Sequence, residues 1–293
     1  MLDLLVFTTV TSAYSPKRLL KEGQKKGLNV KLASFKKLNY YISDKEIVVE
    51  DENGQKLDLS KAVVLRGIGE DPGFTSLRDY LLKCYKDKGG YILNENSLQK
   101  WSSLDKATQY FELQKQGVPV IDSLICSSKK SLRENIKTFG FPSIVKYSLS
   151  SRGYGVYKID SKNDLEGVLF KGFHARNLIL QRFLQGGQDL RVIVIGGQVI
   201  GAMTRKAKSG NYLTNYSQGG TVENYDITKD EKASLLAIKV ADIFSLDYAG
   251  VDLMKNASGE WVVLEINRAC QFKGFEKSTG INVAQKLIEF LST

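Results

Sequence analysis

The sequence predicts a mixed fold of α/β and α+β parts, in which an N-terminal domain with a parallel sheet precedes a larger part rich in long strands. Short apolar runs alternate with helical segments over residues 1–97, which is the pattern of a parallel sheet. From residue 179 onward long strands dominate, and helices are expected only over residues 229–244 and 283–291. At 293 residues the chain has room for two or three domains.

The first domain is expected to open with a strand and a helix that Ser15-Pro16 starts and Gly27 ends. Residues 44–54 are expected to form a small polar hairpin. No Gly-x-Gly-x-x-Gly motif follows the first strand, which argues against a dinucleotide site. The expected strands cover residues 4–9, 30–33, 62–66 and 91–94, and the expected helices cover residues 15–26 and 76–86.

The middle of the chain predicts a second domain. Ser102 is the expected N-cap of a helix over residues 104–116, because Asp105 follows it three residues later. A second helix is expected over residues 128–139, followed by strands over residues 142–147, 155–159 and 178–184. The predicted domains therefore cover residues 1–97, 98–178 and 179–293.

Composition narrows the class of protein. No apolar run approaches the roughly 20 residues of a membrane span, and the N-terminus lacks the basic region of a signal peptide. Cys84, Cys126 and Cys270 are isolated and form no zinc or disulfide pattern, which favours a reducing cytoplasm. The single histidine, His174, excludes a His-rich metal centre. We therefore expect a cytoplasmic protein with no membrane partner.

The net charge of +10 indicates an acidic partner. The chain has no long Lys/Arg tract and no aromatic-interleaved RNA motif, so nucleic acid is not the expected partner. An acidic substrate fits the charge better, although lysines scattered over solvated faces account for much of the excess.

The C-terminal strands carry polar groups that a buried strand normally avoids. Glu265 and Asn267 are two residues apart on one strand and therefore share a face. A turn at Ser258-Gly259 would bring Asp252, on the preceding strand, roughly opposite Glu265. Three oxygen donors on one face suit a hard cation such as Mg²⁺. The alternative is the solvent-facing side of an edge hairpin.

A Gly/Ser-rich segment follows the strand that ends near Lys146. Small residues let backbone N–H groups approach phosphate oxygens, and Lys146 adds a positive charge. The segment lacks Gly-Lys-Ser/Thr, and a strand follows it, so it is not a Walker A loop. It predicts a flap over phosphates, with an ordinary hairpin turn as the alternative. Its small residues include Ser150, Ser151, Gly153 and Gly155.

A third segment, residues 178–184, reads as an apolar strand whose free backbone end could pair with an adenine edge. Asp189 follows this strand after a short Gly-containing turn and could accept a hydrogen bond from a ribose hydroxyl. The alternative is a core strand followed by a turn.

Taken in order, these segments resemble the ATP-grasp superfamily and, within it, the RimK-like carboxylate–amine ligases. The likeness extends over nearly the whole chain, including the N-terminal α/β domain that precedes the two-subdomain ATP-grasp core. The segments that carry it are Asp105-Lys106, Lys146 with residues 148–155, residues 181–184, residues 189–197, residues 205–208, Asn215 with Gly219-Gly220, residues 250–252 and residues 264–267.

The resemblance implies ATP held between two α+β subdomains and two Mg²⁺ ions, with Mn²⁺ as a substitute. Asp252, Glu265 and Asn267 are the implied metal ligands, with Glu265 bridging the ions, and Arg205 is the implied catalytic residue. The backbone around Arg182-Phe183 would hold adenine, and Asp189 the ribose. The implied nucleotide contacts are Lys106, Lys146, Ser150, Ser151, Gly153, Gly155, Gln181, Arg182, Phe183, Leu184, Asp189, Arg191, Leu213, Thr214 and Asn215.

The implied reaction is amide formation through an acyl phosphate, with an amino acid, most favourably glutamate, joined to an acidic peptide, protein or metabolite. Residues 268–276 depart from the small Ser-Pro-Gly-type stretch of the glutamate-adding members, and Leu213 stands where those members tend to have a basic residue. These departures leave open a ligase acting on an amino-group carrier protein, and a coenzyme glutamyl ligase. Arg268 and Lys273 are either readers of an acidic substrate or solvated charges.

An alternative of another class is an ATP-binding regulatory protein without catalysis, against which the complete set of Asp252, Glu265, Asn267 and Arg205 argues. Dimers and tetramers are common in the family, so the resemblance implies a homodimer or a homotetramer without choosing between them.

Overall fold

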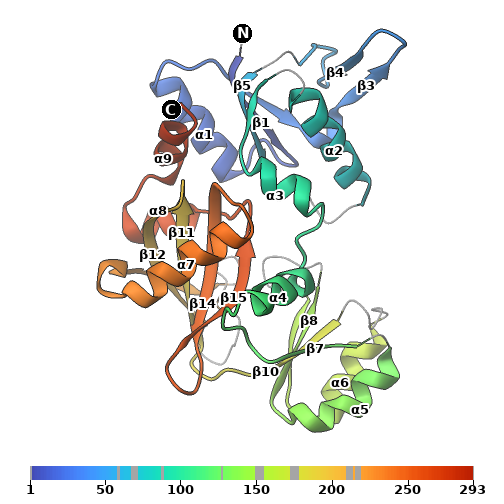
Figure 1. Ribbon diagram of the computed structural model, residues 1–293, viewed down its shortest axis with the longest axis vertical. Coiled ribbons are helices and arrows are strands. Elements are labelled where there is room, and N and C mark those ends of the chain that lie inside the picture. Colours follow the sequence, from blue (N-terminus) through green and yellow to red (C-terminus); the bar gives the residue numbers. More distant parts are fainter. Residues whose placement is uncertain are drawn as a thin grey trace.

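The computed structural model describes residues 2–57, 60–66, 72–86, 89–126, 128–148, 155–171, 178–208, 214 and 219–292. A parallel sheet lies at the end of the molecule that carries both termini, a five-stranded antiparallel sheet lies in the middle, and a smaller lobe lies at the opposite end (Figure 1). None of the helices in the described ranges has the length and apolar character needed to cross a membrane.

The N-terminal sheet has the strand order β2-β1-β5-β6, and all of its strands run parallel, as predicted. Its central strands are continuous apolar runs buried on both faces, which is why they read as strands without polar alternation. The expected polar hairpin lies a few residues earlier than residues 44–54, with its turn closed by Ser43 and Glu46. The elements of this part are β1 (Leu2–Thr8), α1 (Tyr14–Lys25), β2 (Val30–Ser34), β3 (Asn39–Ile42), β4 (Ile47–Glu50), β5 (Ser60–Arg66), α2 (Pro72–Lys86), β6 (Tyr91–Ile92) and α3 (Glu95–Lys100).

The smaller lobe is a four-stranded sheet of order β7-β10-β8-β9 with its own apolar core. The helices α5 and α6 pack on this sheet through Leu132, Ile136 and Leu165, among others. Ser128 caps α5 by accepting from the Ser131 amide, whereas α6 was not expected from the sequence. The second domain was predicted to end at residue 178. The sheet of this lobe extends beyond that residue, because β10 pairs with β7 and β8. The elements are β7 (Ser123–Ile125), α5 (Lys129–Phe139), β8 (Ser143–Tyr147), β9 (Val156–Ile159), α6 (Lys162–Phe170) and β10 (Leu178–Arg182).

The helix α4 (Lys106–Lys115) connects the lobe to the rest of the molecule. The expected N-cap at Ser102 is wrong. Asp105 caps the helix instead, and its carboxylate accepts from the Thr108 amide at 2.8 Å. An aspartate three residues after a serine is the pattern of a capping box, but here the acid is itself the capping residue.

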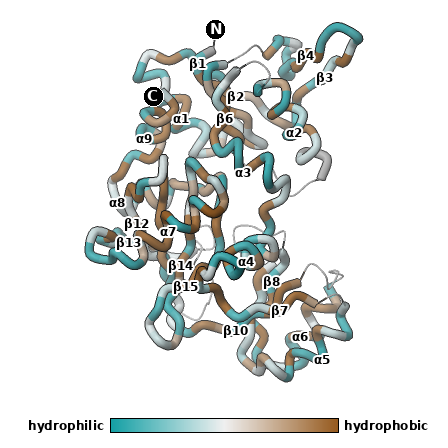
Figure 2. The backbone as a smooth tube through the Cα atoms, in the orientation of Figure 1, coloured by the Kyte–Doolittle hydropathy of each residue, from teal (hydrophilic) through white to brown (hydrophobic). Residues whose placement is uncertain are grey.

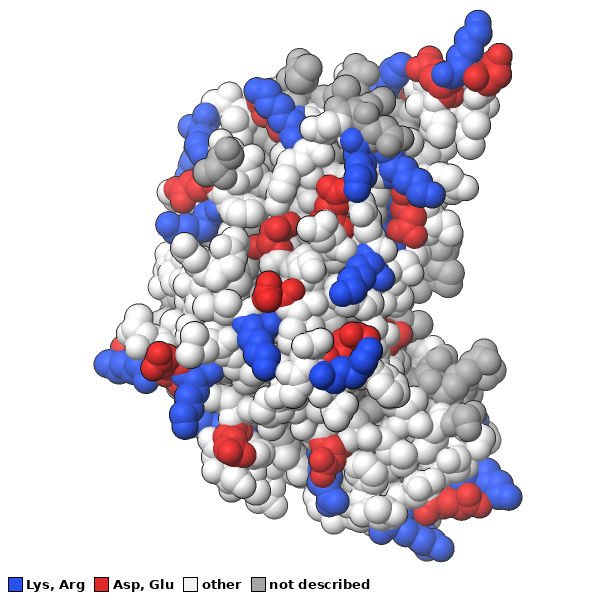
Figure 3. Space-filling model, viewed as in Figure 1, with Lys and Arg blue, Asp and Glu red and all other residues white. Residues whose placement is uncertain are grey.

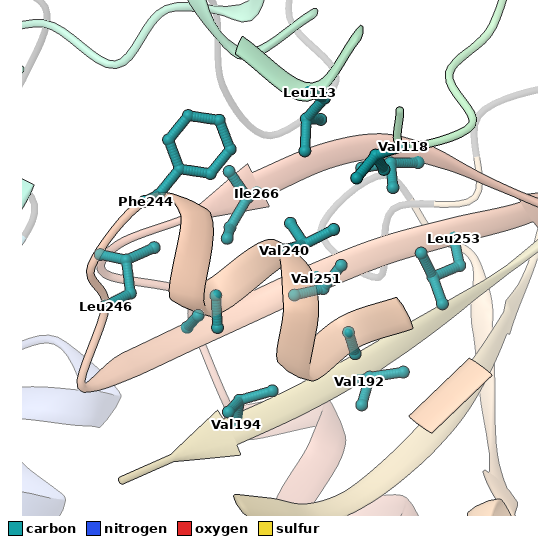
Figure 4. Packing of buried hydrophobic residues seen from close by; sticks show 14 of the residues in the cluster. Leu113, Val118, Val192, Val194, Val240, Phe244, Leu246, Val251, Leu253 and Ile266 are labelled. Atoms are coloured by element: carbon teal, nitrogen blue, oxygen red, sulfur yellow. The ribbon is translucent and has the colours of Figure 1, made fainter. Parts of the chain in front are cut away.

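The antiparallel sheet has the order β13-β12-β11-β14-β15 and is covered on both faces. The helix α7 packs on one face through Val240, and Phe244, directly after the helix, packs there as well (Figure 4). Its other face packs on α8, α9 and the N-terminal domain in one shared core. The hydrophobic residues accordingly concentrate in the strands, whereas the tip of the β3–β4 hairpin is hydrophilic (Figure 2). The elements are β11 (Gln188–Ile195), β12 (Gln198–Lys206), β13 (Thr221–Tyr225), α7 (Glu231–Ile243), β14 (Tyr248–Lys255), β15 (Trp261–Asn267), α8 (Lys273–Thr279), which was not expected, and α9 (Val283–Phe290).

Candidate active site

The strands β14 and β15 form a hairpin that brings two carboxylates together. Asp252 lies directly opposite Glu265 in the register, as the sequence predicted, and Asn267 lies opposite Gly250. The register shifts immediately after Asp252, which marks a bulge at this end of the strand. The hairpin therefore places Glu265 and Asn267 on the same strand face as oxygen donors beside Asp252.

Two arginines hold Asp252 in place. Arg191, opposite Asp252 on β11, makes two hydrogen bonds to its carboxylate, one of them from NH2 to Oδ2 at 2.7 Å. The NH2 group of Arg205 lies 2.9 Å from the same Oδ2. All three side chains are buried, so these contacts are shielded from water.

Arg205 also binds a second buried carboxylate, that of Asp189. The two residues face each other across β11 and β12, and Arg205 donates to Asp189 through Nε at 2.6 Å and NH2 at 2.8 Å. The Thr214 hydroxyl donates to Asp189 Oδ2 as well. The result is a buried chain of alternating charges that runs from Asp189 through Arg205 and Asp252 to Arg191.

The pKa values of this chain follow from the balance between burial and charge. Burial alone would raise the pKa of Asp252, but Arg191 and Arg205 outweigh it, and the pKa lies below its usual range. Burial alone would lower the pKa of Arg191, but the charge of Asp252 outweighs it, and that pKa is raised. Asp252 is therefore an ionised carboxylate at neutral pH.

The helix α4 fixes Lys106 opposite Glu265. The side chain of Gln109 accepts from the Ile266 amide at 2.8 Å and donates to the Ile266 carbonyl at 3.1 Å. The Tyr110 hydroxyl donates to the Leu264 carbonyl at 2.7 Å. These bonds attach α4 to the outer edge of β15 at Leu264 and Ile266, the two neighbours of Glu265 in the sequence. As a result, Lys106 Nζ lies 3.6 Å from Glu265 Oε1 while its side chain is only 6% exposed.

The small lobe contributes Lys146, near the end of β8. Lys146 pairs in register with Ile179 and Val156 in the middle of its sheet. Burial lowers its pKa, although the charges of Glu265, Asp252 and Asp189 oppose the shift. These three carboxylates lie on β11, β14 and β15, so Lys146 is within electrostatic range of the antiparallel sheet.

The segment predicted as a flap begins beside α4. The carbonyl of Ser148 accepts from the Lys106 amide at 3.4 Å, and its hydroxyl accepts from the Ala107 amide at 3.4 Å. The start of this segment is therefore attached to the first turn of α4. Gly155, at the far end of the segment, adopts φ +70°, and its carbonyl accepts from the Tyr147 amide at 2.7 Å.

The strand predicted to meet adenine is β10 and the residues after it. Gln181 is buried and donates to Ser123 Oγ at 2.6 Å, while its Oε1 has no partner among the residues described. Arg182 is exposed and pairs with Asp122 at 3.0 Å. Phe183 and Leu184 are half-buried, and Lys158 Nζ lies 5.1 Å from the centre of the Phe183 ring.

Asp252, Glu265 and Asn267 offer the oxygen donors that Mg²⁺ prefers. A carboxylate has about four lone-pair sites. The arginines occupy three of those on Asp252, which leaves a site on Oδ1 for a cation. No group of three or more His, Cys, Asp or Glu residues suited to a metal occurs within the described ranges, so phosphates or water would have to complete the shell. The donor set therefore fits a cation that arrives with a nucleotide.

Five of the predicted site residues lie outside the described residues, namely Ser150, Ser151, Gly153, Leu213 and Asn215, as does His174. The sequence did not single out the contacts of Gln109 and Tyr110 with β15, because they join helix and strand segments more than 150 residues apart. Nor did it reveal that Arg191 binds Asp252. The only signal in the sequence was that Arg191 follows Asp189 by two residues on one strand, so that the two side chains share a face.

Residues 103–291 match the RimK-like ATP-grasp domain. A protein of Hydrogenovibrio crunogenus named "Probable alpha-L-glutamate ligase" is 30% identical over 295 residues, which cover 99% of this chain and 95% of that protein. A protein of Legionella pneumophila (strain Corby) with the same name is 31% identical over the same shares of the two chains.

Two solved structures share the fold. The ATP-grasp ligase PsnB, complexed with a phosphomimetic variant of its minimal precursor, Mg and ADP, superposes with a TM-score of 0.78 at 20% identity, over 100% of this chain and 99% of that one. A RimK domain protein of Sphaerobacter thermophilus superposes with a TM-score of 0.69 at 16% identity, over 99% of this chain and 100% of that one.

Proposed function

The chain belongs to the RimK-like ATP-grasp family and is an ATP-grasp ligase, and from this premise we propose that it joins an amino acid, most favourably glutamate, to an acidic peptide, protein or metabolite through an acyl phosphate. The observation that carries the proposal is the arrangement around Asp252 and Glu265. It combines oxygen donors for a cation with lysine and arginine groups for phosphate oxygens in one buried place. An enzyme that transfers a phosphoryl group needs these parts and no nucleophilic side chain.

We propose that ATP lies between the sheet of the small lobe and the antiparallel sheet. Lys106, on α4, lies 3.6 Å from Glu265, and Lys146 comes from the lobe and is within electrostatic range of Glu265; the phosphates would lie beside both lysines. The backbone at Arg182-Phe183 is the proposed adenine contact. Asp189 has one lone-pair site left on Oδ1 after binding Arg205 and Thr214, which is enough for a ribose hydroxyl. The remaining proposed contacts are Gly155, Gln181, Leu184, Arg191 and, outside the described residues, Ser150, Ser151, Gly153, Leu213 and Asn215.

Asp252, Glu265 and Asn267 are the proposed ligands of two Mg²⁺ ions, with Glu265 between them and Mn²⁺ as a substitute. Bound there, the cations would neutralise charge on the phosphate oxygens. The chain's own task is to hold the donors in register, which the β14–β15 pairing and the two arginines on Asp252 accomplish.

The proposed reaction has two steps. The acceptor carboxylate attacks the γ-phosphorus of ATP, and ADP leaves with the electron pair of the broken P–O bond. The amine of the amino acid then attacks the acyl carbon, loses a proton and expels phosphate, which forms the amide. Arg205 is the proposed residue for holding a transferring phosphoryl oxygen or the reacting carboxylate, and its contact with Asp252 supports this by keeping it beside the proposed metal ligands. Closure of the segment after Ser148 would exclude water from the acyl phosphate.

Glutamate is favoured because the two relatives at 30% and 31% identity carry the name of a glutamate ligase and because the chain carries a net charge of +10. On the face shown in Figure 3, basic and acidic groups are interspersed, so attraction of an acidic acceptor would come from the net charge and not from one basic tract on that face. Arg268 is tied to the carbonyls of Trp101 at 2.7 Å and Ser97 at 3.3 Å. Burial and the nearby Arg78 lower its pKa to about 10. These bonds favour a structural role for Arg268.

The test is ADP release with Mg²⁺ and ATP across all twenty amino acids, with and without a short glutamate peptide, followed by mass spectrometry of the products. A ladder of glutamate masses on the peptide is the expected result. If ADP release requires a carrier protein or a coenzyme instead of the peptide, the enzyme is a ligase acting on an amino-group carrier protein or a coenzyme glutamyl ligase. No amino-acid-dependent ADP release on any acceptor would overturn the proposal. Sedimentation of the purified protein tests the proposed homodimer or homotetramer. Fractionation of cells tests the proposed cytoplasmic location.

A further inference from the structure

The N-terminal domain contains a buried arginine that the proposed ATP chemistry does not use. Arg66 is the last residue of β5 and is 2% exposed. Its NH2 group donates to the carbonyls of Cys270 at 2.6 Å and Ala269 at 3.3 Å. Its Nε and NH1 groups are buried and have no acceptor among the residues that the structure describes. Because a buried donor without an acceptor is costly, these two groups indicate a missing ligand.

The surroundings of Arg66 are aromatic. The guanidinium carbon lies 5.2 Å from the centre of the Phe272 ring and 5.7 Å from that of Tyr248. The rings stabilise the cation, and the Tyr248 hydroxyl also interacts with the Arg66 side chain, but neither satisfies Nε or NH1. No carboxylate within the described ranges forms an ion pair with Arg66. Nε and NH1 lie on different edges of the guanidinium, so each needs its own acceptor. An anionic oxygen such as that of a carboxylate suits either group, because it adds a charge-assisted hydrogen bond.

Arg66 lies where an open parallel sheet binds ligands. In the strand order β2-β1-β5-β6, the strand after β1 in the sequence, β2, lies on one side of β1, and β5 lies on its other side. The direction of the strand order therefore reverses between β1 and β5. Thr8 and Arg66, which are paired in register, are the last residues of these two strands. Ligands of such sheets bind beyond the carboxyl ends of the strands at this point of reversal.

The same place is close to the proposed reaction centre. Asn267 pairs with Gly250, and a Cβ placed on Gly250 would lie 2.6 Å from Cys270 Cβ and 3.1 Å from Arg191 NH1. Cys270 in turn accepts from Arg66. A chain of direct contacts therefore links Arg66 through Cys270 and Gly250 to Asn267.

We propose that Arg66 binds a carboxylate of the amino-acid substrate that does not take part in the new amide bond. The inference rests on the proposed ligase function and adds a substrate contact to it. Arg66 then holds the incoming amino acid by a carboxylate, either the α-carboxylate or that of the side chain, while its amine faces the acyl phosphate near Glu265. Arg66 selects the substrate and takes no part in the chemical steps.

The test compares Arg66→Gln and Arg66→Lys with the native enzyme on three ligands: glutamate, glutamine and glutamate α-amide. We expect Arg66→Gln to raise the KM for glutamate about 10- to 100-fold, which is the range for losing a hydrogen-bonded charge contact. The KM for ATP should stay within about twofold, and Arg66→Lys should recover part of the loss because it keeps the charge. The native enzyme should discriminate against one of the two amides, and Arg66→Gln should lose that discrimination. Which amide is affected identifies the carboxylate.

Arg18→Gln is the matched control. Arg18 belongs to the same domain, and its Nε, NH1 and NH2 groups are all bonded, to Glu276, Glu22 and Asn282. Its loss should lower stability and leave the KM for glutamate unchanged. A second control, Glu70→Gln with Asp71→Asn, alters acidic residues outside the described ranges. If that double variant reproduced the Arg66→Gln effect, the partner of Arg66 would be the chain itself, and the inference would be wrong.

Equilibrium binding of the three ligands in the presence of ADP separates this inference from the proposed function. Native protein that releases no ADP with any amino acid would overturn the function, while binding would still decide the role of Arg66. Retained discrimination between glutamate and both amides in Arg66→Gln would overturn the inference even if the enzyme is an active ligase.

Discussion

The charges at the centre of the site are arranged so that each has a buried partner. Asp252 is bound by two arginines, whereas Glu265 is 27% exposed and has Lys106 at 3.6 Å. Two carboxylates that face each other on neighbouring strands therefore have different surroundings. This difference allows their structural and chemical contributions to be separated by single substitutions.

Asp252→Asn should lower the free energy of unfolding by about 3–5 kcal/mol, because Arg191 and Arg205 remain buried without the charge that balances them. Glu265→Gln should cost about 1 kcal/mol, because Glu265 is partly exposed. Both variants should lose ADP formation. Urea unfolding and ADP release check this pair of variants, and an equal loss of stability in both would contradict the assignment.

Lys146 gives the site a pH dependence. Burial lowers its pKa, so it loses its proton at a lower pH than the usual lysine value of about 10.4. The charge is present below that pKa and lost above it, and the affinity for ATP should therefore fall as the pH rises toward the usual lysine range. Lys146→Arg keeps its charge there and should flatten the profile. ATP binding measured across alkaline pH checks this, and identical profiles for the two proteins would exclude Lys146 as a phosphate contact.

At the level of elements, α4 sets the distance between the two halves of the site. It reaches β15 through Gln109 and Tyr110 and the start of the flap segment through the Lys106 and Ala107 amides. Figure 1 shows it between the antiparallel sheet and the small lobe. A change in how α4 is attached should therefore alter ATP binding without touching a proposed nucleotide contact.

Gln109→Ala removes both bonds to Ile266 and should cost about 1–3 kcal/mol of unfolding free energy, because the Ile266 amide and carbonyl lose their partners. The KM for ATP should rise, because Lys106 is no longer fixed opposite Glu265. Tyr110→Phe is the milder control, with a cost of about 1 kcal/mol and little change in KM. Unfolding and steady-state kinetics measure both variants. An unchanged KM in Gln109→Ala would show that Lys106 is held by other contacts.

The sequence predicted these elements unequally. The parallel sheet and the β14–β15 hairpin were predicted well, because their signals are local: apolar runs, a Ser-Gly turn and residues two apart on a strand. The helices α3, α6 and α8 were missed. The short α8 contains Gly274, Ser278 and Thr279, which have weak helix propensity, so its formation depends on the burial of Phe275 against the distant core. Arg66 was not singled out, because its partners lie more than 200 residues later.

At the level of the whole molecule, the N-terminal domain and the antiparallel sheet share a core, whereas the small lobe has its own. A polar contact joins α1 to the C-terminal helices: Tyr14 donates to Glu276 at 2.6 Å, and Arg18 binds Glu276 at 3.1 Å and Asn282 at 2.8 Å. We therefore expect two units of unfolding.

Glu276→Gln should lower the free energy of unfolding of the unit formed by the N-terminal domain and the antiparallel sheet by about 1–3 kcal/mol. The reason is that Glu276 is the charged acceptor for both Tyr14 and Arg18. Protection from hydrogen exchange should fall for the amides of the N-terminal sheet and of α8 and α9, and it should stay unchanged for those of β7 to β10. Hydrogen exchange resolved along the chain measures this. A uniform loss of protection that includes the small lobe would show that the molecule unfolds as one unit.

The attachment of α4 has a further consequence for how copies of the protein meet. β15 is the last strand of its sheet, and an uncovered last strand offers its N–H and C=O groups to the strand of another molecule. Here Gln109 occupies both groups of Ile266, Tyr110 occupies the carbonyl of Leu264, and Pro119 accepts from the amide of Val263 at 2.9 Å. The contacts that align the two halves of the site thereby also block the sheet from growing into a polymer at that edge.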